Sequence, residues 1–295
     1  MPTVTPTPRS TPLPPVPTAI PSGSEENPVR MVIVPASSGL SARRAARELE
    51  TSLSERTGRA VEVVLADRYA EALAALCDSV GGVVNVAWLD GVSYAAAEAQ
   101  ACGTPLLQVE RRAGRSSQAG EPIVMVANGD AGIESVADLR GATFCRLGYS
   151  DLATWLIPAI MLQTHGLDVA EIEHVVDYED LTLLLEAVAD GECDAAGVPQ
   201  SAYSGARSAV RNALITLDES PPMPYSILMI PVEMPLDLRN ELERAIVAMS
   251  SDEVDAEALD DLLRFERLVT VESSDLAPVR QFVAEAGLDL AVLGS

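Results

Sequence analysis

The stretch Phe144-Cys145-Arg146-Leu147-Gly148-Tyr149-Ser150-Asp151-Leu152-Ala153-Thr154-Trp155-Leu156-Ile157-Pro158 decides the fold of this chain. Residues 143–145 have the character of a short buried strand, and apolar residues recur at helical spacing from 155 to 165. The polar loop between them therefore joins a strand to a helix, and the preceding run 133–141 predicts another short helix. In open α/β sheets, the loops that follow the strands form the ligand-binding edge.

The same alternation of strand and helix occurs on both sides of this stretch. Strands are predicted at 29–34, 61–65, 83–87, 122–127, 143–145, 195–198 and 227–230, and helices at 41–57, 69–80, 93–101, 135–139, 155–165, 181–189, 236–249, 255–264 and 277–286. Such alternation favours parallel sheets with right-handed crossovers. Two extended crossings, near 106–125 and 213–231, separate two such sets. We therefore expect an α/β fold with two lobes, each a mostly parallel sheet flanked by helices, joined by two hinge crossings.

Composition excludes several classes of function. The chain has 295 residues, a net charge of −24 and 20 basic residues, all of them arginine. This charge argues against binding to nucleic acid or to anionic membranes, which need basic patches. No apolar run reaches the ~20 residues of a membrane span.

The first residues of the chain have a composition of their own. Residues 1–28 are rich in Pro, Thr and Ser, and such a segment stays extended because it buries too little surface to fold. We interpret it as a disordered linker between a removed export or lipid anchor and the folded chain. A disordered tail of a cytosolic protein is the alternative.

The cysteines predict two disulfides. The four cysteines include no Cys-x-x-Cys pair, and only two histidines accompany them, so no zinc site is expected. One pair falls in each predicted lobe, an arrangement that fits an oxidising compartment. The predicted bridges are Cys77–Cys102 and Cys145–Cys193, each joining the ends of neighbouring strand–helix units. Four buried thiols are the alternative.

Several segments, taken in order, resemble the phosphate/phosphonate-binding family of periplasmic solute-binding proteins of ABC transporters, which have the type 2 periplasmic-binding-protein fold. The run 133–158 resembles the entry of that family's second lobe. Further matching pieces are Asp67-Arg68-Tyr69, the segment 85–94, the segment 187–196 and Ser220-Pro221-Pro222-Met223-Pro224. The resemblance covers residues 29–295. With the two crossings, it places lobe 1 at 29–115 plus 222–295 and lobe 2 at 116–221.

The ligand loop departs from the family's pattern. In the family, a Ser-Thr-Ser-Gly sequence at a helix N-terminus holds the oxyanion through hydroxyl and backbone N–H groups. With Trp155 and Pro158 kept in frame, these four positions hold Asp151, Leu152, Ala153 and Thr154. A carboxylate at a helix N-terminus is stabilised by the helix dipole and repels an anion from the same place. Leu181 also replaces a family histidine, so we expect altered specificity, with weak or no binding of phosphonate and phosphate.

Candidate ligand-binding residues follow the predicted strand ends in both lobes. They are hydroxyl, aromatic and acidic side chains: Ser37, Ser38, Tyr69, Trp88, Tyr94, Tyr149, Ser150, Asp151 and Thr154. Aromatic faces beside a carboxylate could hold an amine or quaternary ammonium by cation–π attraction, worth ~0.5–2 kcal/mol per contact. Core packing is the alternative for Trp88, and helix capping is the alternative for Ser37 and Ser38.

The sequence contains no convincing catalytic constellation. Gly148-Tyr149-Ser150 lacks the second glycine of a nucleophile elbow, because Leu152 takes that place. The resemblance implies a non-catalytic, extracytoplasmic solute-binding protein that serves an ABC transporter permease. We expect it to act as a monomer, without cofactor, metal or nucleic acid. The alternative is a degenerate receptor domain that acts as a sensor or protein-interaction module.

Overall fold

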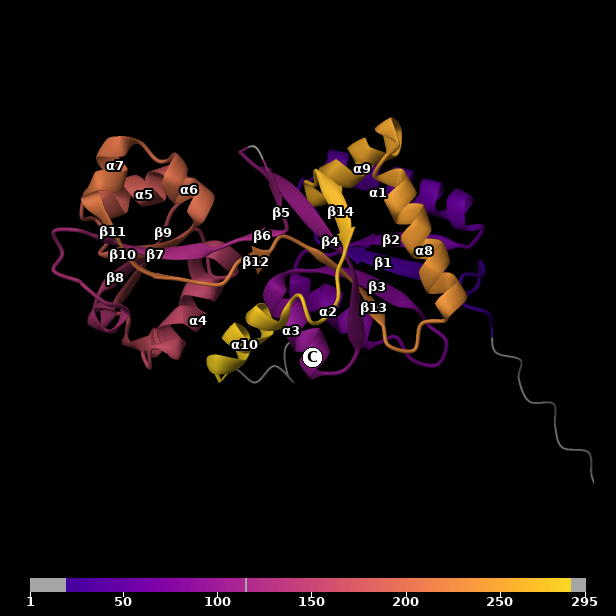
Figure 1. The fold of residues 1–295 in the computed structure, drawn as a ribbon, viewed down its shortest axis with the longest axis horizontal. Helices are drawn as coiled ribbons and strands as arrows, with labels where there is room; N and C mark the ends of the chain where they lie inside the picture. Colours follow the sequence, from indigo (N-terminus) through magenta and orange to yellow (C-terminus); the bar gives the residue numbers. More distant parts are fainter. Residues whose placement is uncertain (1–19, 115, 288–295) are drawn as a thin grey trace, which may run out of the picture.

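The computed structural model describes residues 20–114 and 116–287. In this part of the chain, two helix-covered sheets form two lobes along the long axis of the molecule (Figure 1). Lobe 1 contains a seven-stranded sheet and lobe 2 a five-stranded sheet. Among the described residues, no helix combines the length and the apolar character that a membrane crossing needs.

Lobe 1 takes its strands from both halves of the chain. In sheet order they are β14 (Arg267–Thr270), β4 (Gly103–Ala113), β13 (Ile227–Pro231), β3 (Asn85–Leu89), β1 (Val29–Ile33) and β2 (Val61–Leu65), with β5 (Ser116–Gln118) paired to β4. The helices on one face are α1 (Leu40–Thr57), α8 (Leu236–Met249) and α9 (Glu253–Leu263), and those on the other are α2 (Tyr69–Cys77) and α3 (Gly91–Ala99). Because strand side chains alternate between faces, Met31 packs with the first group and Val32 with the second.

Lobe 2 repeats this sandwich on a smaller scale. In sheet order its strands are β11 (Leu214–Glu219), β7 (Ile123–Asn128), β10 (Ala195–Pro199), β8 (Thr143–Arg146) and β9 (His174–Asp177). A π-helical turn (Leu152–Leu156) and α4 (Ile157–Thr164) pack on one face, with short 3-10 helices at Val136–Leu139 and Val169–Glu171. The opposite face carries α5 (Leu181–Ala189), α6 (Gln200–Gly205) and α7 (Ser208–Ala213).

The chain passes between the lobes through a narrow two-stranded sheet. This sheet pairs β6 (Gly120–Glu121) with β12 (Met223–Pro224) in antiparallel orientation. A side chain at Gly120 would overlap the backbone carbonyl of Met223, so the close approach of the two crossings requires glycine.

The sheets are more mixed than the sequence suggested. The pairs β1–β2, β1–β3, β8–β9 and β8–β10 are parallel, whereas β4 pairs in antiparallel orientation with β13 and β14, and β7 does so with β10 and β11. The physical reason is the double crossing. The outgoing and returning chains run in opposite directions, and each extends into a strand of a sheet.

Ordered backbone begins earlier than residue 29 in the described part of the chain. The amide of Gly23 donates to the carbonyl of Asn27, and the side chains of Ser22 and Asn27 donate to the carbonyl of Gly82. Residues 20–28 are thus attached to lobe 1, although their composition grouped them with the linker. Residues 1–19 of that linker lie outside the described residues.

Both predicted disulfides are present. Cys77 at the end of α2 is bonded to Cys102, with Cα atoms 4.9 Å apart, and Cys145 of β8 is bonded to Cys193, with Cα atoms 5.9 Å apart. Each bridge closes one lobe on itself and none joins the two. The disulfides therefore leave the lobes free to move relative to each other.

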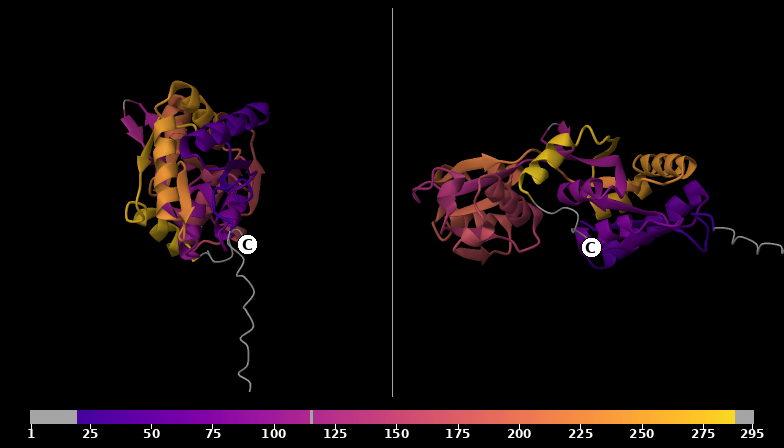
Figure 2. Two further views of the ribbon diagram at one scale, coloured as in Figure 1. Left: turned by 90° about the vertical axis from the view of Figure 1, so that its right-hand side faces the viewer. Right: turned by 90° about the horizontal axis from the view of Figure 1, so that it is seen from below.

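The last described helix, α10 (Ala277–Glu285), lies where the two lobes meet (Figures 1 and 2). Arg280 forms an ion pair with Glu98 of α3 in lobe 1. The other side of the helix places Val279 and Val283 in the apolar cluster that contains Trp155 of lobe 2. This helix thus contacts both lobes beside the cleft.

Candidate ligand site between the lobes

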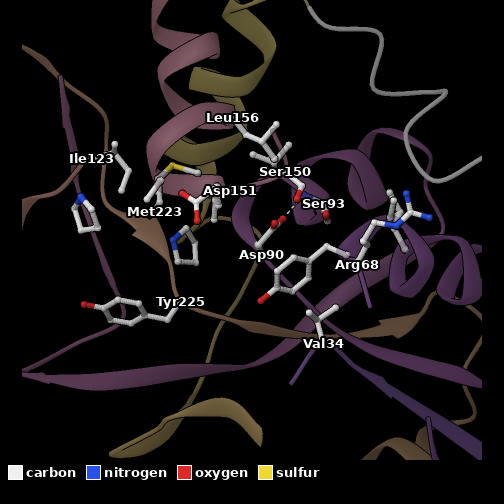
Figure 3. Close-up of a pocket in the computed structure, with 18 of the residues that line it drawn as sticks. Val34, Arg68, Asp90, Ser93, Ile123, Ser150, Asp151, Leu156, Met223 and Tyr225 are labelled. Atoms are coloured by element: carbon white, nitrogen blue, oxygen red, sulfur yellow. Dashed lines mark hydrogen bonds between the residues drawn. The ribbon is translucent and has the colours of Figure 1, made fainter. Parts of the chain in front are cut away.

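A cavity of about 590 Å³ lies between the lobes. Its walls come from the strand-to-helix loops of both lobes and from the crossing strands (Figure 3). The polar and aromatic lining residues are Asp67, Arg68, Tyr69, Asp90, Ser93, Arg111, Glu121, Ser150, Asp151 and Tyr225. Such a volume is in the usual range for small-molecule sites.

Asp151 begins the helical segment on the lobe 2 wall. Its Oδ1 atom accepts hydrogen bonds from the backbone N–H and the Oγ1 hydroxyl of Thr154, both at 2.7 Å. The carbonyl of Asp151 accepts from the amides of Trp155 and Leu156. The protein's own carboxylate thus caps the helix end at which a family member would hold an anion. Asp151 also points toward the cavity (Figure 3).

Asp90 faces the same space from lobe 1. It follows β3 directly and caps α3, accepting from the amide of Ser93 at 2.7 Å. Only 3% of Asp90 is exposed, and this burial raises the pKa of its carboxyl group above the ordinary value, although the hydrogen bonds from Ser93 and Val92 oppose the shift. A buried carboxylate without an ion-pair partner among the described residues gains most from a cationic ligand.

Two tyrosines complete the wall near the crossing strands. Tyr69 opens α2, and burial together with the charge of Asp90 raises the pKa of its phenol. Tyr225 follows β12, and its hydroxyl accepts a hydrogen bond of 2.8 Å from Gln118. Both phenols stay neutral near pH 7, so they offer hydrogen bonds and ring faces rather than charge.

The charged groups on the wall are predominantly acidic. Four carboxylates, Asp67, Asp90, Glu121 and Asp151, face two guanidinium groups, those of Arg68 and Arg111. Arg68 forms an ion pair with Glu71, and this carboxylate partly compensates the positive charge of Arg68. No group of three or more metal-ligating side chains occurs in the part of the chain that the structure describes. Carboxylates therefore outnumber guanidinium groups on the wall of this cavity.

The structure brings three of the predicted site residues to this cavity, namely Tyr69, Ser150 and Asp151. Thr154 lies immediately behind the wall, fully buried, where its hydroxyl accepts from the amide of Leu147 and donates to Asp151. Its role there is to hold the loop.

The remaining predicted residues lie elsewhere. Trp88 and Tyr94 are buried in the two cores of lobe 1. Tyr149 is 75% exposed, and its ring lies 5.5 Å from the guanidinium of Arg146. Ser37 and Ser38 precede α1 without capping it and do not line the cavity.

Sequence reasoning missed several residues of the wall. Asp90 could have been predicted from the sequence, because it follows a strand and precedes a helix, as residues at a ligand-binding edge do. Arg111, Glu121 and Tyr225 lie on or beside the crossing strands, where the pattern of apolar residues says nothing about which side chains face the cleft. The sequence therefore gave no basis for predicting that these three residues line the cavity.

Comparisons with known proteins agree with the geometry. A family model described as the periplasmic substrate-binding protein of phosphonate ABC transporters matches residues 31–276. A comparison with curated protein sequences finds no match.

Solved structures share the two-lobed fold. A protein from Xanthomonas citri bound to chloride aligns with a TM-score of 0.65 and 16% identity, over 88% of this chain and 96% of that one. A binding protein component of an ABC phosphonate transporter from Pseudomonas aeruginosa gives 0.59 and 18%, over 90% and 87%. PhnD1 from Prochlorococcus marinus, in complex with methylphosphonate, gives 0.56 and 13%, over 88% and 98%. At these identities the likeness is evidence for the fold alone.

The family match extends over most of the chain, from β1 to the segment before α10. It agrees with the two lobes, the interlobe cavity and the double crossing described above. The predicted family and the predicted two-lobed α/β fold are both confirmed. The prediction of a non-catalytic protein is confirmed by the family, whose members are substrate-binding proteins of ABC transporters. The chain belongs to the family of periplasmic substrate-binding proteins of phosphonate ABC transporters.

Proposed function

We propose that this protein is a solute receptor of an ABC importer whose interlobe cavity takes an organic cation rather than a phosphonate dianion. The observation that carries the proposal is the position of Asp151. Its carboxylate accepts from the amide and hydroxyl of Thr154 at the helix N-terminus, which is the place where the family's anion would be held. An incoming dianion would be repelled by the carboxylate of Asp151, and the amide and hydroxyl of Thr154 would not be free to bind it, because both already donate to Asp151.

Charge on the opposite wall supports the same conclusion. Asp90 is buried, and deprotonating it without a nearby cation is unfavourable. An ammonium group between Asp90 and Asp151 would be attracted by both lobes at once. This attraction grows as the lobes approach, because closing the cleft removes water and lowers the local dielectric constant. A cation would therefore favour the closed form.

Two tyrosines on the cavity wall could contact the uncharged parts of the ligand as well as its ammonium group. Tyr69 offers a ring face for an alkylammonium group, worth ~0.5–2 kcal/mol per cation–π contact, and Tyr225 offers the face that Arg111 does not cover. Their hydroxyl groups suit a ligand that also carries hydroxyl or amide groups. An amine with an alkyl or hydroxylated body matches these surfaces best.

The open cavity supports a working receptor over a degenerate interaction module. Leu152 and Ala153 lie on its wall but leave about 590 Å³ free, and Leu181 lies in a separate depression on lobe 2. A retired receptor would fill this cleft with apolar side chains. Retention of charged and aromatic groups around a cavity is better explained by ligand binding.

A thermal-shift screen tests the proposal across ligand classes. Alkylamines, quaternary ammonium ions, polyols, phosphate and methylphosphonate are each added in excess to the wild-type protein and to the variant Asp151→Asn. A ligand at 100 times its Kd stabilises the protein by about 2.7 kcal/mol, so Tm should rise by several degrees with amines and stay unchanged with phosphonate. A rise with methylphosphonate alone would refute the proposal.

A charge-matched control separates site effects from general electrostatics. Asp130 is exposed on lobe 2 outside the cavity, so Asp130→Asn removes the same charge without touching the site. It should respond to amines as the wild type does.

The cellular context follows from the family and remains part of the proposal. We propose that the protein acts as a monomer outside the cytoplasm, held near its permease through the Pro/Thr-rich N-terminal segment and a lipid anchor. Fractionation of cells that express the full-length protein, with and without inhibition of lipoprotein processing, tests the anchor.

A further inference from the structure

A second, smaller chamber adjoins the main cavity. It has a volume of about 270 Å³ and shares Val34, Tyr69, Arg111 and Tyr225 with the wall of the main cavity. Its far end is formed by the C-terminus of α9, including Leu263 and Arg264, and by the loop that follows β1. The two cavities therefore meet at Tyr69, Arg111 and Tyr225.

The chamber differs in charge from the main cavity. Its charged lining residues are two arginines, Arg111 and Arg264, and no carboxylate contributes to its wall. The main cavity, by contrast, carries four carboxylates. The combined site is therefore acidic at the end near Asp151 and basic at the end near Arg264.

Arg111 is held rigidly but is not neutralised. Its Nε and Nη2 atoms donate to the carbonyl oxygens of Arg264 and Leu263, at 2.8 and 3.0 Å, and its guanidinium lies 4.4 Å from the centre of the Tyr225 ring. It forms no ion pair with any described residue. Burial, with the neighbouring charge of Arg264, lowers the pKa of Arg111, while Glu121 is close enough to oppose the shift without pairing with it.

Arg264 adds a second positive charge at the same end. It caps α9 in a left-handed conformation (φ 50°), its side chain is exposed, and it makes no ion pair with any described residue. Ser226, also on the chamber wall, contributes a hydroxyl group. A planar guanidinium with unused N–H donors, a second arginine and a hydroxyl suit a carboxylate.

We infer that this basic chamber is an anion subsite, so that the preferred solute is a zwitterion with an ammonium group at the Asp90/Asp151 end and a carboxylate at the Arg111/Arg264 end. The inference rests on the proposed function, because it places the cation in the main cavity. It adds a specificity element on the crossing strand β4 and the end of α9.

Calorimetric titration with matched pairs of ligands tests this inference. Each pair consists of an ω-amino carboxylate and the alkylamine of the same chain length, for example 4-aminobutanoate and butylamine. Wild-type protein should bind the best amino carboxylate at least about tenfold more tightly than its amine, the effect of one charge-assisted contact. Arg111→Gln should abolish this preference and Arg264→Gln should reduce it, and Arg264→Gln, which lies outside the wall of the main cavity, should keep the affinity for the amine.

Controls and outcomes separate the two proposals. Arg47, an exposed arginine of α1 that makes no ion pair with any described residue, provides Arg47→Gln, which should keep the full preference. Equal binding of amine and amino carboxylate by the wild type, or a preference that survives both Arg111→Gln and Arg264→Gln, overturns the anion subsite and leaves the cation site intact. No binding of any amine overturns the proposed function and the subsite with it. Because Arg264 is exposed, Arg264→Gln tests the subsite even where Arg111→Gln fails to fold.

Discussion

Replacing Asp151 by asparagine should separate ligand affinity from stability. The asparagine side chain would keep an oxygen in the position of Oδ1, so the hydrogen bonds from the amide and hydroxyl of Thr154 at 2.7 Å can persist. What the change removes is the negative charge at the helix N-terminus. That interaction is worth ~0.3–1 kcal/mol, so we expect the free energy of unfolding to fall by no more than about 1 kcal/mol.

The effect on a bound cation should be larger. A hydrogen bond to a charged group contributes about 1.5–3 kcal/mol, and each 1.4 kcal/mol is a factor of ten in Kd. The variant Asp151→Asn should therefore bind butylamine roughly 10- to 150-fold more weakly than the wild type. Calorimetry gives the affinity, and urea unfolding followed by circular dichroism gives the stability.

The combination of the two readouts makes the prediction specific. An unchanged affinity for butylamine, with stability lowered as expected, would show that Asp151 is a helix cap and nothing more. A loss of several kcal/mol in stability would show that the loop depends on the charge itself, which contradicts the small dipole effect expected here. Asp130→Asn should change neither quantity measurably.

Three further predictions concern the supporting structure. Gly197→Ala should destabilise the protein by about 1–3 kcal/mol and weaken ligand binding, because a methyl group there would collide with Pro158 and displace the segment that carries Asp151; chemical unfolding and calorimetry measure both effects, and wild-type values would refute the account. Burial raises the pKa of Asp90, so the wild type should lose stability relative to Asp90→Asn as pH rises above about 4; a difference in unfolding free energy between the two proteins that does not change with pH would contradict this. Removing the Cys145–Cys193 bridge by a double alanine substitution should cost about 4 kcal/mol in the chain-entropy model, measured by unfolding, whereas an unchanged midpoint would show that the bridge adds nothing.

The fold was largely predictable because its long elements carry strong periodicity. Helix α1 was expected at 41–57 and lies at Leu40–Thr57, with Gly58 ending it in the left-handed conformation. The short edge strands β9 and β14 and the two-turn helices α6 and α7 were not predicted, since segments of four to six residues show too little of either period.

The site was less predictable than the fold for a geometric reason. All five residues of β3 are buried, so the sequence gives no sign that Trp88 points into the core behind the sheet, away from the cleft. Asp151 could be found because it interrupts a family motif at a helix N-terminus. Arg111 could not, because the residue pattern along β4 does not say whether its side chain faces the cavity.

The most direct test of the account is a pair of calorimetric titrations of the wild-type protein at pH 7, one with butylamine and one with methylphosphonate. With Asp90 and Asp151 on the cavity wall and Thr154 already bonded to Asp151, we predict saturable binding of the amine and no detectable binding of the phosphonate. Sub-micromolar binding of methylphosphonate, with no heat from the amine, would contradict the account.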